Sequence, residues 1–290
     1  MSESGSIVWP SPNWPLWRLN WSLANSPDAE GITITSAYYN GHEVFYKASL
    51  PSLRVQYDHN CGPYKDPLNY DTAQPINGSS RVKTYTVTSG GLAGLAIEAF
   101  YRIGQYRLTQ RWTFWMDGRI SPRLYSAGLQ CLDDHRHHAY WRFDFDIDGA
   151  GNDIAFEYNT TTPNTGWGPG WHVKQYEMSR VKNPPTARSW AVMDRSTLRG
   201  YHIIPGANDG VADAFSNRDI WFMQYRGNED RHGQQGGAGD DGLATYLDPG
   251  QTIVGTDLVI WYCSHLGHRA EAAHADEVHS CGPNLVPFRW

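Results

Sequence analysis

The segment from His135 to Gly149 constrains the fold of this chain more than any other feature. Apolar and polar side chains alternate through it, which is the period of a β-strand whose two faces differ. His135 and His137 fall in the apolar set, so we expect both imidazoles to point to the same buried side as close neighbours. Imidazole binds copper and zinc well, and the pair therefore predicts a metal site rather than two isolated core histidines.

Short β-rich runs separated by turn residues fill most of the remaining sequence. Arg107–Met116 also alternates and then meets the hairpin signal Asp117-Gly118, whereas Leu258–Cys263 is continuously apolar, as in a strand buried on both faces. The other runs are Ile32–Tyr39, His42–Ala48, Arg81–Thr88 and Leu95–Tyr101. No long helical pattern competes with them. We therefore predict a mostly β protein, a large antiparallel β-sandwich with a short helix or two, formed by residues 1–290 as a single domain.

Charge and hydropathy exclude several classes of protein. The net charge is −6 and no run is rich in lysine and arginine, so nucleic acid is not an expected partner. No stretch approaches about 18 consecutive apolar residues, so we expect no membrane partner. The N-terminal residues MSESGSIVWPSPNWP carry no basic or apolar signal-peptide region, which favours the cytoplasm.

The cysteines form no C-x-x-C pair, which argues against a cysteine-based zinc site. Without a visible signal peptide we expect reduced, buried thiols, and one or two disulfides are the alternative for an exported chain. The four positions are Cys61, Cys131, Cys263 and Cys281.

The spacing around the histidine pair resembles a motif of copper amine oxidases. Arg142 follows His137 by five residues, Asp144 follows by two more, and Asp148-Gly149 closes the strand. In that family the His-x-His strand carries two copper ligands. The resemblance therefore implies that His135 and His137 bind copper.

A second segment resembles the part of the family that holds the third copper ligand. Asp257–Tyr262 is followed by His268, which stands where the third histidine is expected. The resemblance thus implies a copper site of three imidazoles. His265, His274 and His279 are nearby alternatives for the third position.

Upstream segments extend the resemblance in the expected order. Tyr46–Leu50 and Val55–Tyr57 resemble the opening of the family's catalytic domain, whose last tyrosine hydrogen-bonds the cofactor. This role falls on Tyr57. Leu68–Asp71 stands near the place of the family's catalytic base, which implies Asp71 for that role.

The stretch Ile103–Arg107, which leads into Trp112–Gly118, resembles the family segment whose tyrosine becomes topaquinone, the quinone cofactor, and the resemblance implies that role for Tyr106. Alternation places Tyr106 on the inward face of its strand and Arg107 on the outward face. Gln105 stands where the family has an asparagine that helps to orient the cofactor, and Arg107 stands where it has an acidic residue. These two positions depart from the family pattern.

The resemblance implies a copper-dependent oxidoreductase that oxidises a primary amine with O2 to an aldehyde, ammonia and hydrogen peroxide. It also implies a homodimer. Two alternatives stay open at this point. One is a copper oxidase or oxygenase that uses an unmodified Tyr106, and the other is a non-catalytic module of the same fold.

Carboxylates on the opposite face of the histidine strand predict a second ion. In the family, aspartates at the positions of Asp144, Asp146 and Asp257 form a peripheral calcium-type site. Hard oxygen ligands of this kind suit calcium. The alternative is a solvated strand face, or pairing of these carboxylates with Arg142.

Overall fold

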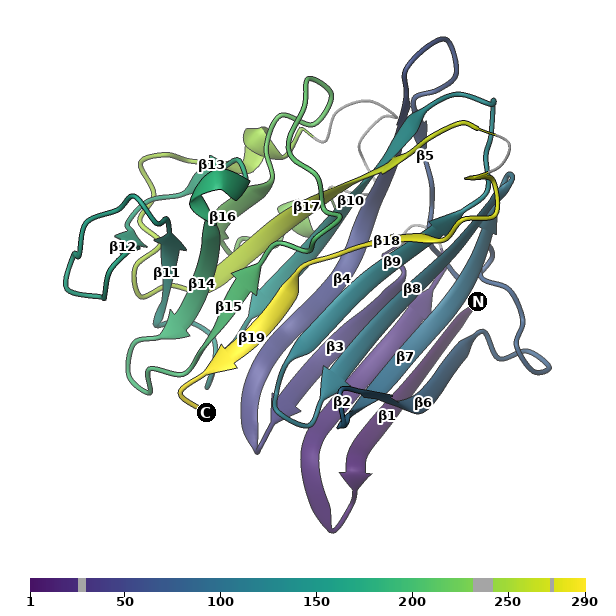
Figure 1. Cartoon of the computed structure of the whole chain (residues 1–290). Helices are drawn as coiled ribbons and strands as arrows, with labels where there is room; N and C mark the ends of the chain where they lie inside the picture. The colour runs from purple at the N-terminus through teal and green to yellow at the C-terminus, as the bar shows by residue number, and fades with distance from the viewer. Residues whose placement is uncertain (26–29, 232–241, 272–273) are drawn as a thin grey trace.

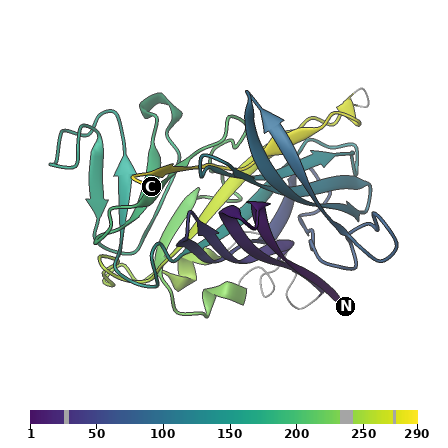
Figure 2. The same ribbon diagram turned by 90° about the horizontal axis from the view of Figure 1, so that it is seen from below.

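Two antiparallel sheets packed face to face form the computed structural model of this chain, which describes residues 1–25, 30–231, 242–271 and 274–290 (Figures 1 and 2). In spatial order the first sheet contains β1 (Ser2–Ser11), β2 (Trp14–Ala24), β3 (Ile32–Tyr39), β4 (His42–Tyr57), β10 (His135–Phe145), β17 (Leu258–His268), β16 (Ile220–Gln224) and β13 (Met178–Arg180), with β5 (Tyr64–Lys65) paired to β4.

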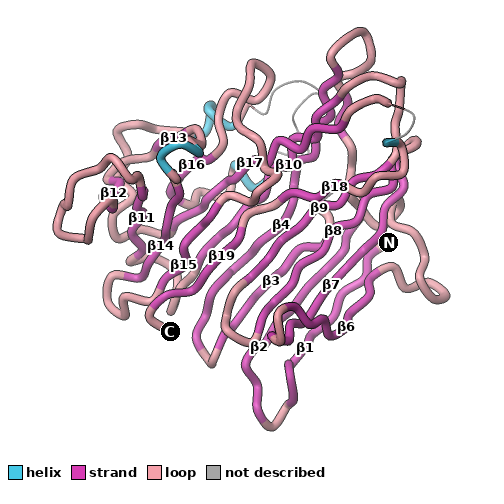
Figure 3. The backbone as a smooth tube through the Cα atoms, in the orientation of Figure 1, coloured by secondary structure: helices cyan, strands magenta, loops and turns pink. Residues whose placement is uncertain are grey.

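The second sheet places the C-terminal strand between two groups of earlier strands. In spatial order it contains β12 (Trp171–Lys174), β11 (Asp153–Tyr158), β14 (Ser189–Asp194), β15 (Gly200–Ile204), β19 (Asn284–Phe288), β9 (Ile120–Ala127), β8 (Tyr106–Trp115), β7 (Leu92–Ile103) and β6 (Val82–Ser89), with β18 (His279–Cys281) paired to β9. The helical segments within the described residues are the short 3-10 turns η1 (Pro184–Thr186), η2 (Glu229–Arg231) and η3 (Leu243–Tyr246) (Figure 3).

The mostly β, sandwich-type fold predicted from the sequence is confirmed. Each run expected to be a strand lies in one to within a residue at its ends, and Ile32–Tyr39 coincides with β3. The continuous apolar run Leu258–Cys263 begins β17, a central strand flanked by β10 and β16. A central position explains its composition, because such a strand is covered on both faces.

Aromatic side chains from both sheets fill the space between them. Trp112 of β8 packs edge-on against Trp141 of β10 with 5.5 Å between ring centroids. Trp17 of β2 and Phe114 of β8 make a similar contact at 5.0 Å. The Trp112–Trp141 contact shows that the odd-numbered face of β10 points into the core, as the alternation predicts.

The even-numbered face of β10 is also buried from His138 to Asp144, so the alternative of a solvated strand face is wrong. Tyr140 donates a hydrogen bond to Ser216, and Arg142 pairs with Glu229. Segments that follow β15 in the chain therefore cover this face. A two-residue alternation separates polar from apolar positions, but it does not report whether a later loop covers the polar side.

Two of the cysteines differ from the reduced state expected for them. Cys61 and Cys131 form a disulfide that joins the segment after β4 to the turn before β10. Cys263 and Cys281 are buried, as expected. Within the described ranges, no helix has the length and apolar character that crossing a bilayer requires.

Candidate metal centre

The register of three neighbouring strands brings the predicted site residues together. His135 of β10 lies directly opposite Tyr57 of β4 on one side and opposite His268 of β17 on the other. Because directly paired residues in antiparallel strands share a face, all three side chains point into the core. His137 lies two positions along the same strand, and its ring centroid is 5.1 Å from that of His135. The His135 and His268 rings are also 5.1 Å apart.

Hydrogen bonds orient two of the three imidazoles as metal-binding histidines are usually oriented. Nδ1 of His135 lies 3.1 Å from the carbonyl oxygen of Asp133, and Nε2 of His268 lies 3.1 Å from that of His274. A nitrogen that faces a carbonyl must carry the proton, so the other ring nitrogen offers a lone pair. Those nitrogens, Nε2 of His135 and Nδ1 of His268, are buried and have no hydrogen-bond partner.

His137 completes the set with a different partner. Its Nε2 lies 3.1 Å from the Ser126 hydroxyl, and its buried Nδ1 has no hydrogen-bond partner. Burial lowers the pKa of all three histidines, most strongly that of His137, so the rings are neutral near pH 7. Neutral imidazole is the form that binds a metal ion.

The three histidines have the ligand chemistry of a metal site, but their nitrogens do not lie close enough together to bind one ion without a change in ring orientation. Among the described residues, two sets of three side-chain ligand atoms lie within 4.8 Å of one another, and these histidines form neither set. Binding one ion therefore requires the rings to turn toward a common point. Two of the alternatives for the third ligand are less suitable, because His265 lies on the opposite face of β17 and His274 pairs with Glu271 and Glu277. The third alternative, His279, lies beside His268 with 4.6 Å between the ring centroids.

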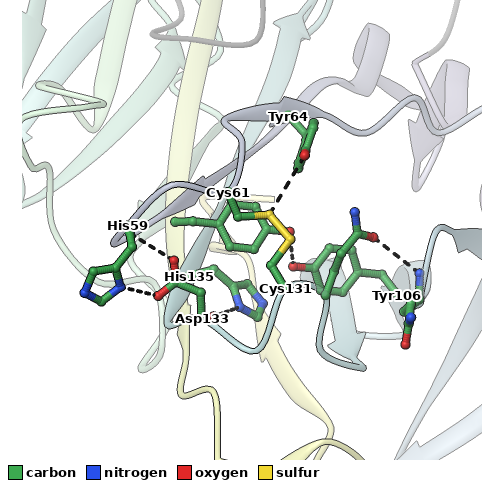
Figure 4. The surroundings of a disulfide bond; sticks show 10 residues. His59, Cys61, Tyr64, Tyr106, Cys131, Asp133 and His135 are labelled. Atoms are coloured by element: carbon green, nitrogen blue, oxygen red, sulfur yellow. Dashed lines mark hydrogen bonds and ion pairs between the residues drawn. A yellow bond between two sulfur atoms is a disulfide. The ribbon is translucent and has the colours of Figure 1, made fainter.

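Tyr106 reaches this group from the opposite sheet. It begins β8, is buried, and its ring centroid lies 4.8 Å from His137 and 5.2 Å from His135. Its hydroxyl lies 2.5 Å from that of Tyr57. Figure 4 shows Tyr106 near the Cys61–Cys131 disulfide and His135. The geometry therefore joins two tyrosines to the histidine group.

Both phenols of this pair are protonated at neutral pH. Burial, reinforced by the Tyr57 contact and by the negative charge of Asp66, raises the pKa of Tyr106 far above its usual value. Burial also raises the pKa of Tyr57 to about 12. Arg107 does not counter this effect, because it is exposed and pairs with Asp276 at 2.5 Å. Gln105 is exposed as well.

The structure does not bring Asp71 to the tyrosine pair, and it brings another carboxylate instead. Asp71 sits in an exposed turn, where its side chain accepts a hydrogen bond from Asn25. Asp66, just after β5, is buried, and burial raises its pKa to about 7. Its Oδ2 has no hydrogen-bond partner, and its charge acts on both tyrosines. Nothing in the sequence distinguishes Asp66 from an ordinary loop aspartate before a proline.

The three predicted calcium-type ligands also lie together. Carboxylate oxygens of Asp144, Asp146 and Asp257 lie within 4.8 Å of one another. Burial, with mutual repulsion, raises the pKa of Asp144 and of Asp146 to about 7. Arg142 lies 3.0 Å from Asp144, so the predicted pairing with arginine is present in addition to the cluster.

Comparison with known proteins confirms the resemblance to copper amine oxidases. Residues 133–276, just under half of the chain, match the family described as the copper amine oxidase enzyme domain. A primary amine oxidase and a copper methylamine oxidase, both from Arthrobacter sp. (strain P1), are each 22% identical over 222 residues, covering 60% of this chain and 34% of the relative. The chain thus spans about a third of the length of these curated relatives.

Solved structures of amine oxidases share the fold over nearly the whole chain. A copper-containing benzylamine oxidase from Hansenula polymorpha has a TM-score of 0.72 at 16% identity, covering 95% of this chain and 59% of that protein. Aspergillus nidulans amine oxidase has a TM-score of 0.68 at 14% identity, covering 98% and 55%. Pichia pastoris lysyl oxidase has a TM-score of 0.68 at 15% identity, covering 98% and 54%.

Proposed function

We propose that this chain, which resembles the enzyme domain of copper amine oxidases in sequence and fold, is a copper-dependent oxidase of primary amines. The contact of Tyr106 with Tyr57 and with the two histidines of β10 carries the proposal. It joins a tyrosine in the family's cofactor position to three imidazoles that each keep one buried nitrogen free of hydrogen bonds.

The proposed chemistry needs copper on the three histidines and topaquinone at Tyr106. When present, they would supply the oxidation of the amine to an aldehyde and ammonia and the reduction of O2 to hydrogen peroxide. Tyr57 holds the Tyr106 oxygen in place through the 2.5 Å contact between their hydroxyl groups. The burial of both rings keeps bulk water away from the reacting atoms.

We assign the proton transfer in this reaction to Asp66 rather than to Asp71. A carboxylate with a pKa of about 7 is half ionised at neutral pH, and it can both accept and return a proton there. Burial is the physical cause of that value. The exposed Asp71 is held by Asn25 and has no comparable environment.

The protonated state of Tyr106 favours a second candidate function. A phenol with a strongly raised pKa resists conversion to phenolate, and the exposed Arg107 does not offset this resistance. In this alternative the chain is a copper oxidase or oxygenase in which Tyr106 stays unmodified. Mass spectrometry can distinguish the two functions, because only the first changes the mass of Tyr106.

Aerobic incubation of the metal-free protein with Cu2+ tests the proposal. We expect a coloured species that reacts with phenylhydrazine, and a mass increase on the peptide that contains Tyr106. Tyr106→Phe should give neither signal. Tyr101→Phe is the matched control, because Tyr101 is a buried tyrosine of β7 that hydrogen-bonds Gln110 instead of the site, and it should give both signals. An unmodified wild-type peptide would exclude topaquinone and would favour the second candidate.

We also propose that Asp144, Asp146 and Asp257 bind calcium. Their proximity and raised pKa values support the proposal, because closely spaced carboxylates repel each other until a cation joins them. Ca2+ should raise the melting temperature of the wild-type protein at pH 8 and should not raise that of Asp146→Asn. Equal shifts in the two proteins would exclude the site.

A further inference from the structure

A second group of metal-ligating side chains lies on the opposite face of the same two strands. The register that pairs His135 with His268 also pairs His138 of β10 with His265 of β17. Alternation turns this second pair away from the copper centre, and Cys263 shares its face because it precedes His265 by two residues. Imidazole and thiolate ligands from both strands therefore meet outside the sandwich core.

The potential ligand atoms are close together and shielded from water. Nδ1 of His138 lies 2.8 Å from Nδ1 of His265, and Sγ of Cys263 lies 3.9 Å from the same His265 nitrogen. One ligand atom from each residue lies within 4.8 Å of the other two. All three residues are buried.

These distances are near those of a tetrahedral metal site. With metal–nitrogen bonds of about 2.0–2.1 Å and a metal–sulfur bond of about 2.3 Å, tetrahedral angles give about 3.3 Å between nitrogens and about 3.6 Å from nitrogen to sulfur. The observed 2.8 and 3.9 Å differ from those values by a few tenths of an ångström, within the reach of small ring rotations.

A carboxylate stands behind one of the ligands, as in many metal sites. Nε2 of His265 lies 2.8 Å from Oδ1 of Asp219, and Lys182 holds the same oxygen at 2.9 Å. A carboxylate in this position holds the proton on Nε2 and leaves Nδ1 free to bind the ion. The arrangement therefore selects the His265 nitrogen that faces His138 and Cys263.

We propose that His138, Cys263 and His265 bind a thiophilic metal ion, either Zn2+ or Cu+, at a site distinct from the copper centre. Two imidazoles with one thiolate suit both ions, and they do not suit the hard ions that prefer carboxylates. With a neutral ring from each histidine, the group carries a net charge of +1 with Zn2+ and of zero with Cu+. Asp219 supplies a negative charge beside it. The fourth position falls to water or to the hydroxyl of Ser216, which lies 3.8 Å from the sulfur.

Burial argues against a catalytic role for Cys263. A cysteine that acts as a nucleophile needs an exposed thiolate, and Cys263 is completely shielded from solvent. The alternative to a metal site is a direct hydrogen bond between the two Nδ1 atoms, in which one ring donates and the other accepts.

Titration of the chelator-treated full chain with Co2+ tests this site, and it does not depend on the proposed oxidase function. Cobalt bound to thiolate gives a charge-transfer band in the near ultraviolet. We expect the wild-type band to saturate at one equivalent, to be lost in Cys263→Ser, and to persist in His137→Ala, which removes a ligand of the copper centre. Cys281→Ser is the matched control, because Cys281 is a buried cysteine outside the cluster, and it should keep the band.

A variant that keeps the thiol protects the test against misfolding of Cys263→Ser. His138→Gln should retain the fold by circular dichroism and weaken Co2+ binding by at least about 10- to 100-fold. Competition of Zn2+ and of anaerobic Cu+ against bound Co2+ identifies the preferred ion. A wild-type protein without the band, or a band that survives in folded Cys263→Ser, would overturn the proposal.

Discussion

The two faces of the β10–β17 pair share one backbone register but carry different chemical groups. The inner face points into the sandwich core, and the outer face points away from it. On the inner face, the His135–His268 pair meets Tyr57 and Tyr106, whose phenols are both protonated at pH 7. On the outer face, the His138–His265 pair meets a thiol and the Asp219 carboxylate. The phenols come from β4 and β8, whereas Asp219 comes from the segment just before β16.

The difference shows that the register places the histidine pairs and that the covering segments determine which groups surround each pair. Imidazoles beside phenols suit copper and tyrosine chemistry, and imidazoles beside a thiol suit a thiophilic ion. Farther along the outer face, Arg142 and Asp144 are buried with Glu229, so charge is concentrated on that side. Substitutions at adjacent positions of β10 can therefore test the properties of the two faces independently.

The largest expected effect comes from replacing two neighbouring histidines of β10 by alanine, one at a time. His137→Ala should abolish copper binding at the inner face, because it removes one of three imidazoles that share the ion. His138→Ala alters the next residue on the opposite face and should leave copper binding within about threefold of wild type, well below the 10- to 100-fold cost of losing a supporting group. Isothermal titration with Cu2+ measures both. Equal losses in the two variants would mean that the faces are not independent.

Asp66→Asn should lower the rate of amine oxidation by about 10²- to 10⁴-fold, the usual contribution of a positioned general base. In the wild-type protein the rate should rise with pH through about 7, as Asp66 loses its proton. Asp71→Asn is the control and should keep most of the activity. Oxygen consumption against pH records the effect, and a strong loss in Asp71→Asn alone would return the role of base to that residue.

The same substitution at Asp66 should change stability in the opposite direction. The pKa of Asp66 is higher in the folded state than in the unfolded chain, so its contribution to stability is fully present below about pH 4 and is lost as pH rises through about 7. Asp66→Asn should therefore raise the free energy of unfolding at pH 8 and change it little at pH 4. Urea denaturation at the two pH values measures this. A variant that is less stable at pH 8 would contradict the inferred burial of an unpaired charge.

Removing the buried arginine of the outer face should destabilise the fold without touching the inner site. Arg142→Leu leaves Asp144 and Glu229 buried without their cation, and it should cost about 3–5 kcal/mol of unfolding free energy. Denaturant unfolding of the two proteins measures the difference. A cost below about 1 kcal/mol would mean that the outer face is hydrated, and Ca2+ should recover part of the loss if the aspartates bind it.

The smallest expected effect is that of Arg107→Ala. Arg107 follows Tyr106 in the chain, but it is exposed and pairs with Asp276, so its removal should change the unfolding free energy by less than about 1 kcal/mol. The phenylhydrazine reaction of the copper-treated protein should be unchanged. A large change in that reaction would show that the charge next to the tyrosine reaches the inner site.

Strand alternation predicted the inner face of β10 and the outward direction of Arg107, because both follow from the local backbone period. The order of short motifs selected Tyr57 and His268 as candidates, and the register places them on either side of His135. The burial of the outer face could not be predicted in this way. It depends on loops that come after β15 in the chain and fold back over β10.

Single side chains in irregular segments were the hardest to predict. Asp66 and Asp71 lie five residues apart in one loop, and only the folded chain shows that one is buried and the other exposed. The pairing of Cys61 with Cys131 likewise depends on a loop and a turn that meet in space. The sequence suggested His265 as an alternative copper ligand, but its position on β17 places it beside Cys263 and His138.

Copper X-ray absorption spectroscopy of the protein loaded aerobically with one equivalent of Cu2+ tests the central assignment most directly. The inner-face centre of His135, His137 and His268 requires scattering from imidazole nitrogens with no sulfur neighbour, and the spectrum should be the same in Cys263→Ser. His137→Ala should lose the imidazole signature. A copper–sulfur shell in the wild-type protein that disappears in Cys263→Ser would place the copper on the outer face and contradict the account.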